Sequence, residues 1–215
     1  MIDVTNRATD VNIDTTASDA PILVSLTDWA NATDQEDAPS SLTVLKISRE
    51  PIYVCLFTDQ GANVTTHYLE QTETWTGGYI HCLGQGCPAC AAQIERKRFV
   101  LLPVADLTDA RVKILRVALE KGPGKLLTEM LKVLSLPNRA EIITKISRTG
   151  PYQYLVDAHR QDPLSPDVGA AIKRFRDQFN AKIIDLQSVI TRLTDVEIAQ
   201  NERIARRLAL EGHPQ

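Results

Sequence analysis

The sequence has little or none of several features that are typical of membrane-spanning or secreted proteins. Aromatic residues make up 5% of its 215 residues, and it contains no run of eighteen apolar residues, so we expect no membrane-spanning helix. Asp3, Asp10 and Asp14 occupy the region where a secretion signal would be basic and then apolar, which predicts a cytoplasmic protein. In a reducing compartment, the four cysteines favour metal binding over disulfides.

Catalytic arrangements are also missing. The motifs provide no Ser-His-Asp set, no paired carboxylates and no open metal site. The segment Gly122-Pro123-Gly124-Lys125 is not a phosphate loop, because the first glycine of that pattern would fall at Leu119 and the lysine is followed by Leu126. The His-x-Glu signature of zinc deaminases is absent as well. We therefore predict a protein that is not an enzyme.

Three of the four cysteines lie within nine residues, between Cys82 and Cys90. Cys87 and Cys90 flank the tight Pro-Ala turn of a zinc knuckle, and structural zinc takes four tetrahedral ligands. A redox pair, a disulfide or plain core residues are the alternatives. A redox Cys-x-x-Cys needs no third cysteine upstream, so the spacing favours zinc. Cys55 is interpreted as a buried free thiol.

Two histidines, His67 and His81, lie near enough to supply the fourth ligand. Segments 64–71 and 78–83 are predicted to form a hairpin with its tip around Thr74-Trp75, which would place His67 opposite Cys82 and Leu69 opposite Ile80. His81 neighbours Cys82 and would point to the other face. The prediction is a closed structural zinc site whose ligands are His67, Cys82, Cys87 and Cys90.

Charge and composition divide the chain. Residues 1–50 carry nine acids and three bases, whereas residues 91–149 carry twelve bases and six acids, a moderately basic region that suits a polyanion. Residues 1–41 are predicted to be a mostly disordered acidic arm with an apolar island at 21–29. We expect an OB-like domain over 42–163, containing a zinc subdomain at about 64–98, and a helical appendage over 164–215.

Short strands dominate the central region. They are predicted over 42–48, 52–58 and 96–106, with a second hairpin over 141–148 and 152–158 that turns at 149–151. Segment 111–120 fits strand or helix. Pro123 is expected to open a helix over 125–134. Ser165-Pro166 predicts the start of a helix that continues to 193, and Thr194 with Glu197 predicts a capping box for another helix to about 210.

This pattern predicts a mainly β fold with helical additions (α+β), an OB-type antiparallel barrel of the kind that binds oligonucleotides. Such a groove combines cations with aromatic rings that stack on bases. Trp75 is expected to be the most exposed of these rings. The candidate nucleic-acid-binding residues are Tyr53, Phe57, Tyr68, Trp75, Tyr79, Arg96, Lys97, Arg98, Phe99, Arg111, Lys113 and Lys125.

The ligand order His67, Cys82, Cys87, Cys90, followed by the basic-to-apolar segment 96–106, resembles the zinc-containing single-stranded DNA-binding proteins of tailed phages. The resemblance covers roughly residues 42–160. It implies an OB-fold that coats single-stranded DNA during replication, recombination and repair, in a bacterial or phage-infected cell. That family has a basic N-terminal arm and an acidic C-terminal tail, whereas this chain begins acidic and ends near-neutral.

The alternative function is a zinc-stabilised transcription or replication adaptor that acts through protein contacts. In either case, the acidic arm and the C-terminal helices are the expected surfaces for replication or recombination proteins, or for self-association. No membrane partner is expected.

Overall fold

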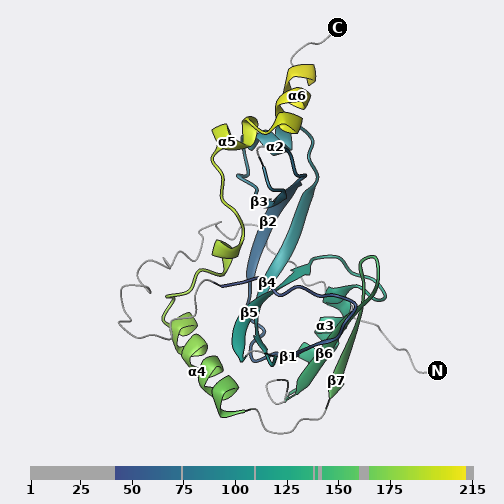
Figure 1. The fold of residues 1–215 in the computed structure, drawn as a ribbon, viewed down its shortest axis with the longest axis vertical. Coiled ribbons are helices and arrows are strands. Elements are labelled where there is room, and N and C mark those ends of the chain that lie inside the picture. The colour runs from purple at the N-terminus through teal and green to yellow at the C-terminus, as the bar shows by residue number, and fades with distance from the viewer. Residues whose placement is uncertain are drawn as a thin grey trace, which may run out of the picture.

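The structure is a computed structural model that describes residues 42–73, 75–108, 110–137, 139, 142–159 and 165–211. The predicted acidic arm lies outside the described residues. The described part is an antiparallel sheet with several helices, which confirms the α+β class (Figure 1). Its elements are β1 (Ile52–Cys55), β2 (Ala62–Leu69), β3 (Gly78–His81), α2 (Pro88–Ala91), β4 (Arg96–Asp106), β5 (Arg111–Ala118), α3 (Leu126–Leu134), β6 (Ile143–Gly150), β7 (Gln153–His159), α4 (Pro166–Asn180), the 3-10 helix η2 (Leu186–Val189), α5 (Asp195–Ala199) and α6 (Glu202–Glu211).

Strand β4 is the centre of the sheet and has the bounds predicted for it, because its apolar middle is buried on both faces. One edge of β4 pairs first with β2 and then, at residues 105 and 106, with β1. The other edge pairs with β5, so the ambiguous segment 111–120 is a strand. β1 continues to β6, and β6 to β7, which gives the order β3-β2-β4-β1-β6-β7.

Among the described residues, no strand pairing closes this sheet into a barrel. Closure would require the outer edge of β5 to pair with β7. Residues 43–45 instead hydrogen-bond to Ile114 on that edge. Helix α3 then fills the space between the two strands, where Leu126 and Met130 share a buried cluster with Leu115 of β5 and Val156 of β7. Segment 42–48, predicted as a strand, forms only this single bridge.

The C-terminal region begins as predicted and then departs from the prediction. The Ser165 hydroxyl accepts a hydrogen bond from the Val168 amide at 3.4 Å and caps α4. The continuous helix predicted to residue 193 is wrong, because α4 ends at Asn180 and Lys182 adopts a φ of 58°. The apolar residues beyond this break pack into the core through η2, beside α4, rather than along a helical stripe.

The last two helices return to the region of the predicted zinc site. The capping box of Thr194 and Glu197 is confirmed and starts α5, and α6 follows. Ile198 and Ile204 are fully buried against Leu69, Ile80 and residues of α2. We call this unit, formed by the outer ends of β2 and β3 together with α2, α5 and α6, the metal module. Figure 1 shows it at one end of the molecule, with α3 and α4 toward the other.

Candidate metal centre and adjoining groove

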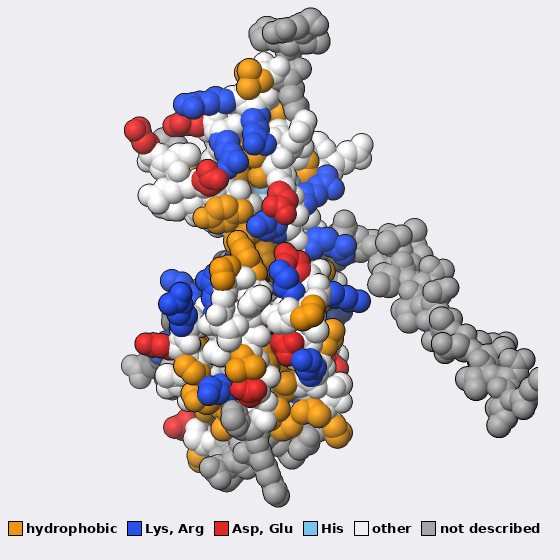
Figure 2. All heavy atoms as spheres, turned by 90° about the vertical axis from the view of Figure 1, so that its right-hand side faces the viewer, with side chains coloured by type: hydrophobic (Ala, Val, Ile, Leu, Met, Phe, Trp, Pro, Cys, Tyr) orange, Lys and Arg blue, Asp and Glu red, His pale blue; other side chains and the backbone are white. Residues whose placement is uncertain are grey.

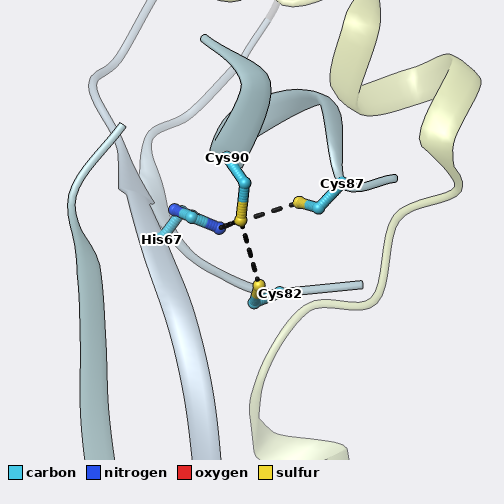
Figure 3. A group of neighbouring side chains, drawn as sticks. All are labelled: His67, Cys82, Cys87 and Cys90. Atoms are coloured by element: carbon cyan, nitrogen blue, oxygen red, sulfur yellow. Dashed lines mark hydrogen bonds between the residues drawn. The ribbon is translucent and has the colours of Figure 1, made fainter. Parts of the chain in front are cut away.

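The four predicted ligands converge in the metal module (Figure 3). His67 lies on β2, Cys82 follows β3, and Cys87 and Cys90 lie at the start of α2. Their ligand atoms all lie within 4.8 Å of one another. Cys90 Sγ is 3.3 Å from His67 Nε2 and 3.5 Å from Cys82 Sγ. Ligands about 2.3 Å from a tetrahedral ion would be roughly 3.8 Å apart, so these four side chains form a group that can hold a metal ion.

His67 is held in the orientation and tautomer that a ligand needs. Its side chain is fully buried, and Nδ1 lies 3.0 Å from the Ile94 carbonyl and 3.2 Å from the Glu95 carbonyl. A carbonyl only accepts, so Nδ1 carries the proton and Nε2 presents a lone pair to the cysteines. Burial lowers the pKa of His67, which favours the neutral, metal-binding form.

The hairpin register differs from the predicted one by two residues. His67 pairs with Ile80, and Leu69 with Gly78, rather than with Cys82 and Ile80. The Thr72 amide donates to the Trp75 carbonyl at 2.8 Å, so the centre of the hairpin lies one residue earlier in the chain than expected. A two-residue shift leaves every side chain on its original face of the sheet, so the selection of His67 over His81 as the candidate ligand is unaffected.

His81 has a different role. Its Nε2 lies 3.3 Å from the Gln187 carbonyl, on the side of η2 and away from the cysteines. The group that can hold a metal includes His67 and not His81, as the alternation of side chains along a strand predicts.

The thiols of the site differ in acidity. Burial, together with the neighbouring Cys90 and Cys87, raises the pKa of Cys82 to about 11. Burial also acts against ionisation of Cys87, but backbone groups of Leu83, Cys90 and Ala89 outweigh it and lower its pKa. Three thiolates this close repel one another, and a bound cation would remove that penalty.

Two local features lie next to the four candidate ligands, one of them in the loop between Cys82 and Cys87. Gly84 and Gly86 have φ values of 76° and 81°, which residues with a Cβ rarely adopt. The Arg96 Nε donates to Cys90 Sγ at 3.0 Å, which places a guanidinium beside the sulfur of a candidate ligand. Arg96 was predicted to bind nucleic acid, and the structure places it next to the candidate metal ligands.

A groove of about 160 Å³ lies between the end of β5 and the β6–β7 hairpin. We call it the aromatic groove. Tyr152, at the two-residue turn between β6 and β7, is 63% exposed and forms part of its wall. The turn spans Pro151 and Tyr152, rather than the predicted 149–151. The groove is lined by Tyr79, Lys97, Phe99, Arg116, Ala118, Glu120, Lys125, Leu126, Tyr152 and Tyr154.

One wall of the aromatic groove continues as a row of rings. The ring centroids of Tyr68 and Tyr79 are 5.1 Å apart, as are those of Tyr79 and Phe99. Arg116 lies over this row, with Cζ 4.1 Å from the Tyr79 centroid and 5.1 Å from the Phe99 centroid. On the opposite wall, Lys125 Nζ is 5.6 Å from the Tyr152 centroid. The arrangement alternates cations with ring faces.

The remaining predicted binding residues lie elsewhere. Phe57 is buried beneath α4, where it contacts Phe175. Trp75 was expected to be exposed, and this expectation is wrong: its ring packs on the core of the metal module. Lys113 forms an ion pair with buried Asp106 at 2.8 Å. Outside the groove, Tyr53, Arg98 and Arg111 are exposed.

Among the aromatic and cationic residues of the groove, sequence reasoning missed Arg116, Tyr152 and Tyr154. The signal for Arg116 was its position inside the apolar run of β5, between the buried Leu115 and Val117. A charged residue in such a run suggests a special environment. Tyr154 lies on β7 and Tyr152 in the turn that precedes it, and only the tertiary fold brings this hairpin near β5.

A larger hollow of about 310 Å³ lies beside α6, against the end of β2. Its cations are mostly matched by carboxylates. Arg203 lies 2.6 Å from Glu70, and Lys97 lies 3.8 Å from Glu95. Arg207 donates to the Ala92 carbonyl at the end of α2. The Arg203 and Arg207 contacts join α6 to the rest of the metal module. The hollow is lined by three cations against two carboxylates, whereas the aromatic groove has three cations against one, so the groove is better suited to an anion.

Comparison with family models, curated proteins and solved structures finds no match for the chain. Within the part of the chain that the structure describes, no helix is both long and apolar enough to cross a membrane.

Proposed function

We propose that this protein binds single-stranded DNA without catalysis, using the aromatic groove. The observation that carries the proposal is the composition of the groove: four aromatic rings, three cations and one carboxylate, a net charge of +2 from Lys97, Arg116 and Lys125 against Glu120. Figure 2 shows Lys and Arg side chains around exposed hydrophobic ones at the narrow waist of the molecule. Cations and stackable rings together are what an unpaired strand requires.

A single strand suits this groove better than a duplex. Ring faces contribute only when bases are free to stack on them, and the bases of a duplex are already stacked. Tyr68, at one end of the row of rings, is 45% exposed, and Tyr152, on the other wall, is 63% exposed, so bases of an extended strand can reach a ring on either side of the groove. The proposed fold is an incomplete OB-type barrel, and the proposed roles are in DNA replication, recombination and repair, as the resemblance to phage proteins implies.

We further propose that the metal is zinc and that its role is structural. Three sulfurs and one imidazole nitrogen form a closed tetrahedral set typical of structural zinc, with no position for a reactive water. Protein purified under reducing conditions should contain one zinc per chain by elemental analysis. Cys87→Ser and His67→Ala should lower that content, whereas Cys55→Ser and His81→Ala should not. Cys55 is a buried thiol of the main core and serves as the matched control.

Binding is tested by fluorescence anisotropy with labelled oligo(dT) and a duplex of equal length. We expect tighter binding to the single strand and a log–log salt slope near −2, since three groove cations contribute about −0.7 each. Lys97→Ala should weaken binding and make the slope shallower. Lys173→Ala, an exposed lysine on α4 that pairs with Asp177, is the control. Equal affinity for both nucleic acids would contradict the proposal.

A second function, the protein-binding adaptor, is favoured by one observation. Val196 and Leu210 on the C-terminal helices are 59% and 77% exposed, so these helices offer apolar side chains to a partner. If oligo(dT) does not bind even at low salt, this function takes precedence.

A further inference from the structure

Arg116 is the cation of the aromatic groove that lacks a carboxylate partner among the described residues. The other two are paired: Lys97 lies 3.8 Å from Glu95, and Lys125 lies 2.8 Å from Glu120. Arg116 is also half-buried, and burial lowers its pKa. An unpaired cation withdrawn from water is costly, so a site that keeps one is suited to an incoming anion.

The surroundings of Arg116 fix its position. Its strand neighbours, Leu115 and Val117, are buried on the opposite face, and Arg116 pairs across β5 and β4 with the fully buried Leu101. Its guanidinium lies over the rings of Tyr79 and Phe99. The two rings stand at 86° to each other, so the planar guanidinium can lie flat on only one of them, and the N–H donors on the edges turned away from the rings are available to an anion.

We infer that Arg116 is the phosphate anchor of the groove, binding one phosphodiester of the DNA strand through its guanidinium. The inference rests on the proposed function and assigns phosphate binding and base contacts to different residues of the groove. A planar fork fits two phosphate oxygens at once, which a lysine ammonium does not do. Tyr152 and Tyr154, on the other wall, are left to contact bases.

The experiment compares two substitutions of Arg116 on two ligands of equal length, oligo(dT) and an abasic deoxyribose-phosphate strand. Arg116→Gln removes the charge, and Arg116→Lys keeps the charge but loses the fork. Arg174→Gln, on the exposed side of α4, is the charge-matched control. Tyr152→Ala serves as the comparison for a base contact.

We expect Arg116→Gln to weaken binding about tenfold or more, on the scale of a lost charge-assisted hydrogen bond, and to make the salt slope shallower by about 0.7. Arg116→Lys should lose most of the affinity while keeping the slope. The loss caused by Arg116→Gln should be the same on the abasic strand. The loss caused by Tyr152→Ala should disappear there, because no base remains to stack.

Two results would overturn the anchor while leaving DNA binding intact. In the first, both Arg116 variants bind oligo(dT) as tightly as the parent protein. In the second, the loss disappears on the abasic strand, which would make Arg116 a base contact. Failure of the parent protein to bind either strand would instead refute the proposed function, and the anchor with it.

A measurement on the unmodified protein covers the case in which the variants do not fold. Phenylglyoxal modifies accessible arginines, and peptide mass spectrometry locates the modified sites. Oligo(dT) should protect Arg116 severalfold and leave Arg174 unprotected. Equal modification of Arg116 with and without a saturating strand would overturn the inference.

Discussion

Ile198→Ala tests whether the metal module is one unit built from two distant parts of the chain. Ile198 lies on α5, is fully buried, and belongs to the same cluster as Ala89 and Cys87 of the metal-binding turn. The substitution removes three carbon atoms, worth about 0.8 kcal/mol each in transfer free energy, and leaves a cavity that adds to the cost. We expect the module to lose about 3 kcal/mol of stability.

That loss should also appear in the affinity for the metal. Because α2 packs against α5 and α6, the geometry of Cys87 and Cys90 depends on this packing. Metal binding is coupled to folding of the site, and each 1.4 kcal/mol corresponds to a factor of ten. A loss of 3 kcal/mol in the module therefore predicts up to about a hundredfold weaker zinc binding, although Ile198 is not a ligand.

The assay is competition for zinc with a chromogenic chelator under reducing conditions, combined with thermal unfolding. Val196→Ala is the matched control, since Val196 lies on the same helix and is 59% exposed. It should change neither zinc affinity nor the unfolding temperature by more than a small amount. If Ile198→Ala behaves like Val196→Ala in both measurements, the C-terminal helices are not part of the metal-binding unit.

Three further predictions address other features. Gly86→Ala should destabilise the metal loop by about 1 kcal/mol or more, seen as a lower unfolding temperature, because Gly86 has a φ of 81°. Thr194→Ala should cost about 1 kcal/mol in urea unfolding, since it removes the cap of α5. Burial of Asp106 opposes its ionisation, but hydrogen bonds from Lys113 and Thr108 outweigh burial and lower its pKa. The ionised carboxylate therefore stabilises the folded protein fully above the ordinary aspartate pKa. This stability is lost as the pH falls through the lowered pKa of the folded state. Asp106→Asn should therefore be destabilising at pH 7, by about 1–3 kcal/mol in urea unfolding, and the difference from the parent protein should shrink near pH 3.

Local signals in the sequence predict the cluster of candidate metal ligands and the bounds of the central strand well. The spacing of Cys82, Cys87 and Cys90 restricts the fold to a tight turn, and the face argument selects His67. The apolar run of β4 ends at charged residues on both sides, so its bounds coincide with the predicted ones. These features depend on residues close together in the sequence or on one strand.

Features that depend on tertiary packing are predicted less well. The apolar spacing that suggests a helix to residue 193 is satisfied instead by core packing on both sides of the break at Lys182. Trp75 looks exposed between polar neighbours, but the metal module provides an apolar surface for it. Arg116 gains its significance from Tyr79 and Phe99 on other strands, and a single sequence does not reveal that proximity.

The metal module combines segments that are far apart in the chain, and this has a consequence during its synthesis. Ile94 and Ile198 pack in one cluster but lie 198 − 94 = 104 residues apart in the chain. At about 5–20 residues per second, the ribosome needs roughly 5–20 seconds to add that stretch after the cysteines have emerged. During this interval the thiols and the apolar side of α2 lack the helices that cover them. The nascent chain is therefore at its most vulnerable to oxidation and aggregation before α5 and α6 are made, and early zinc binding would shield it.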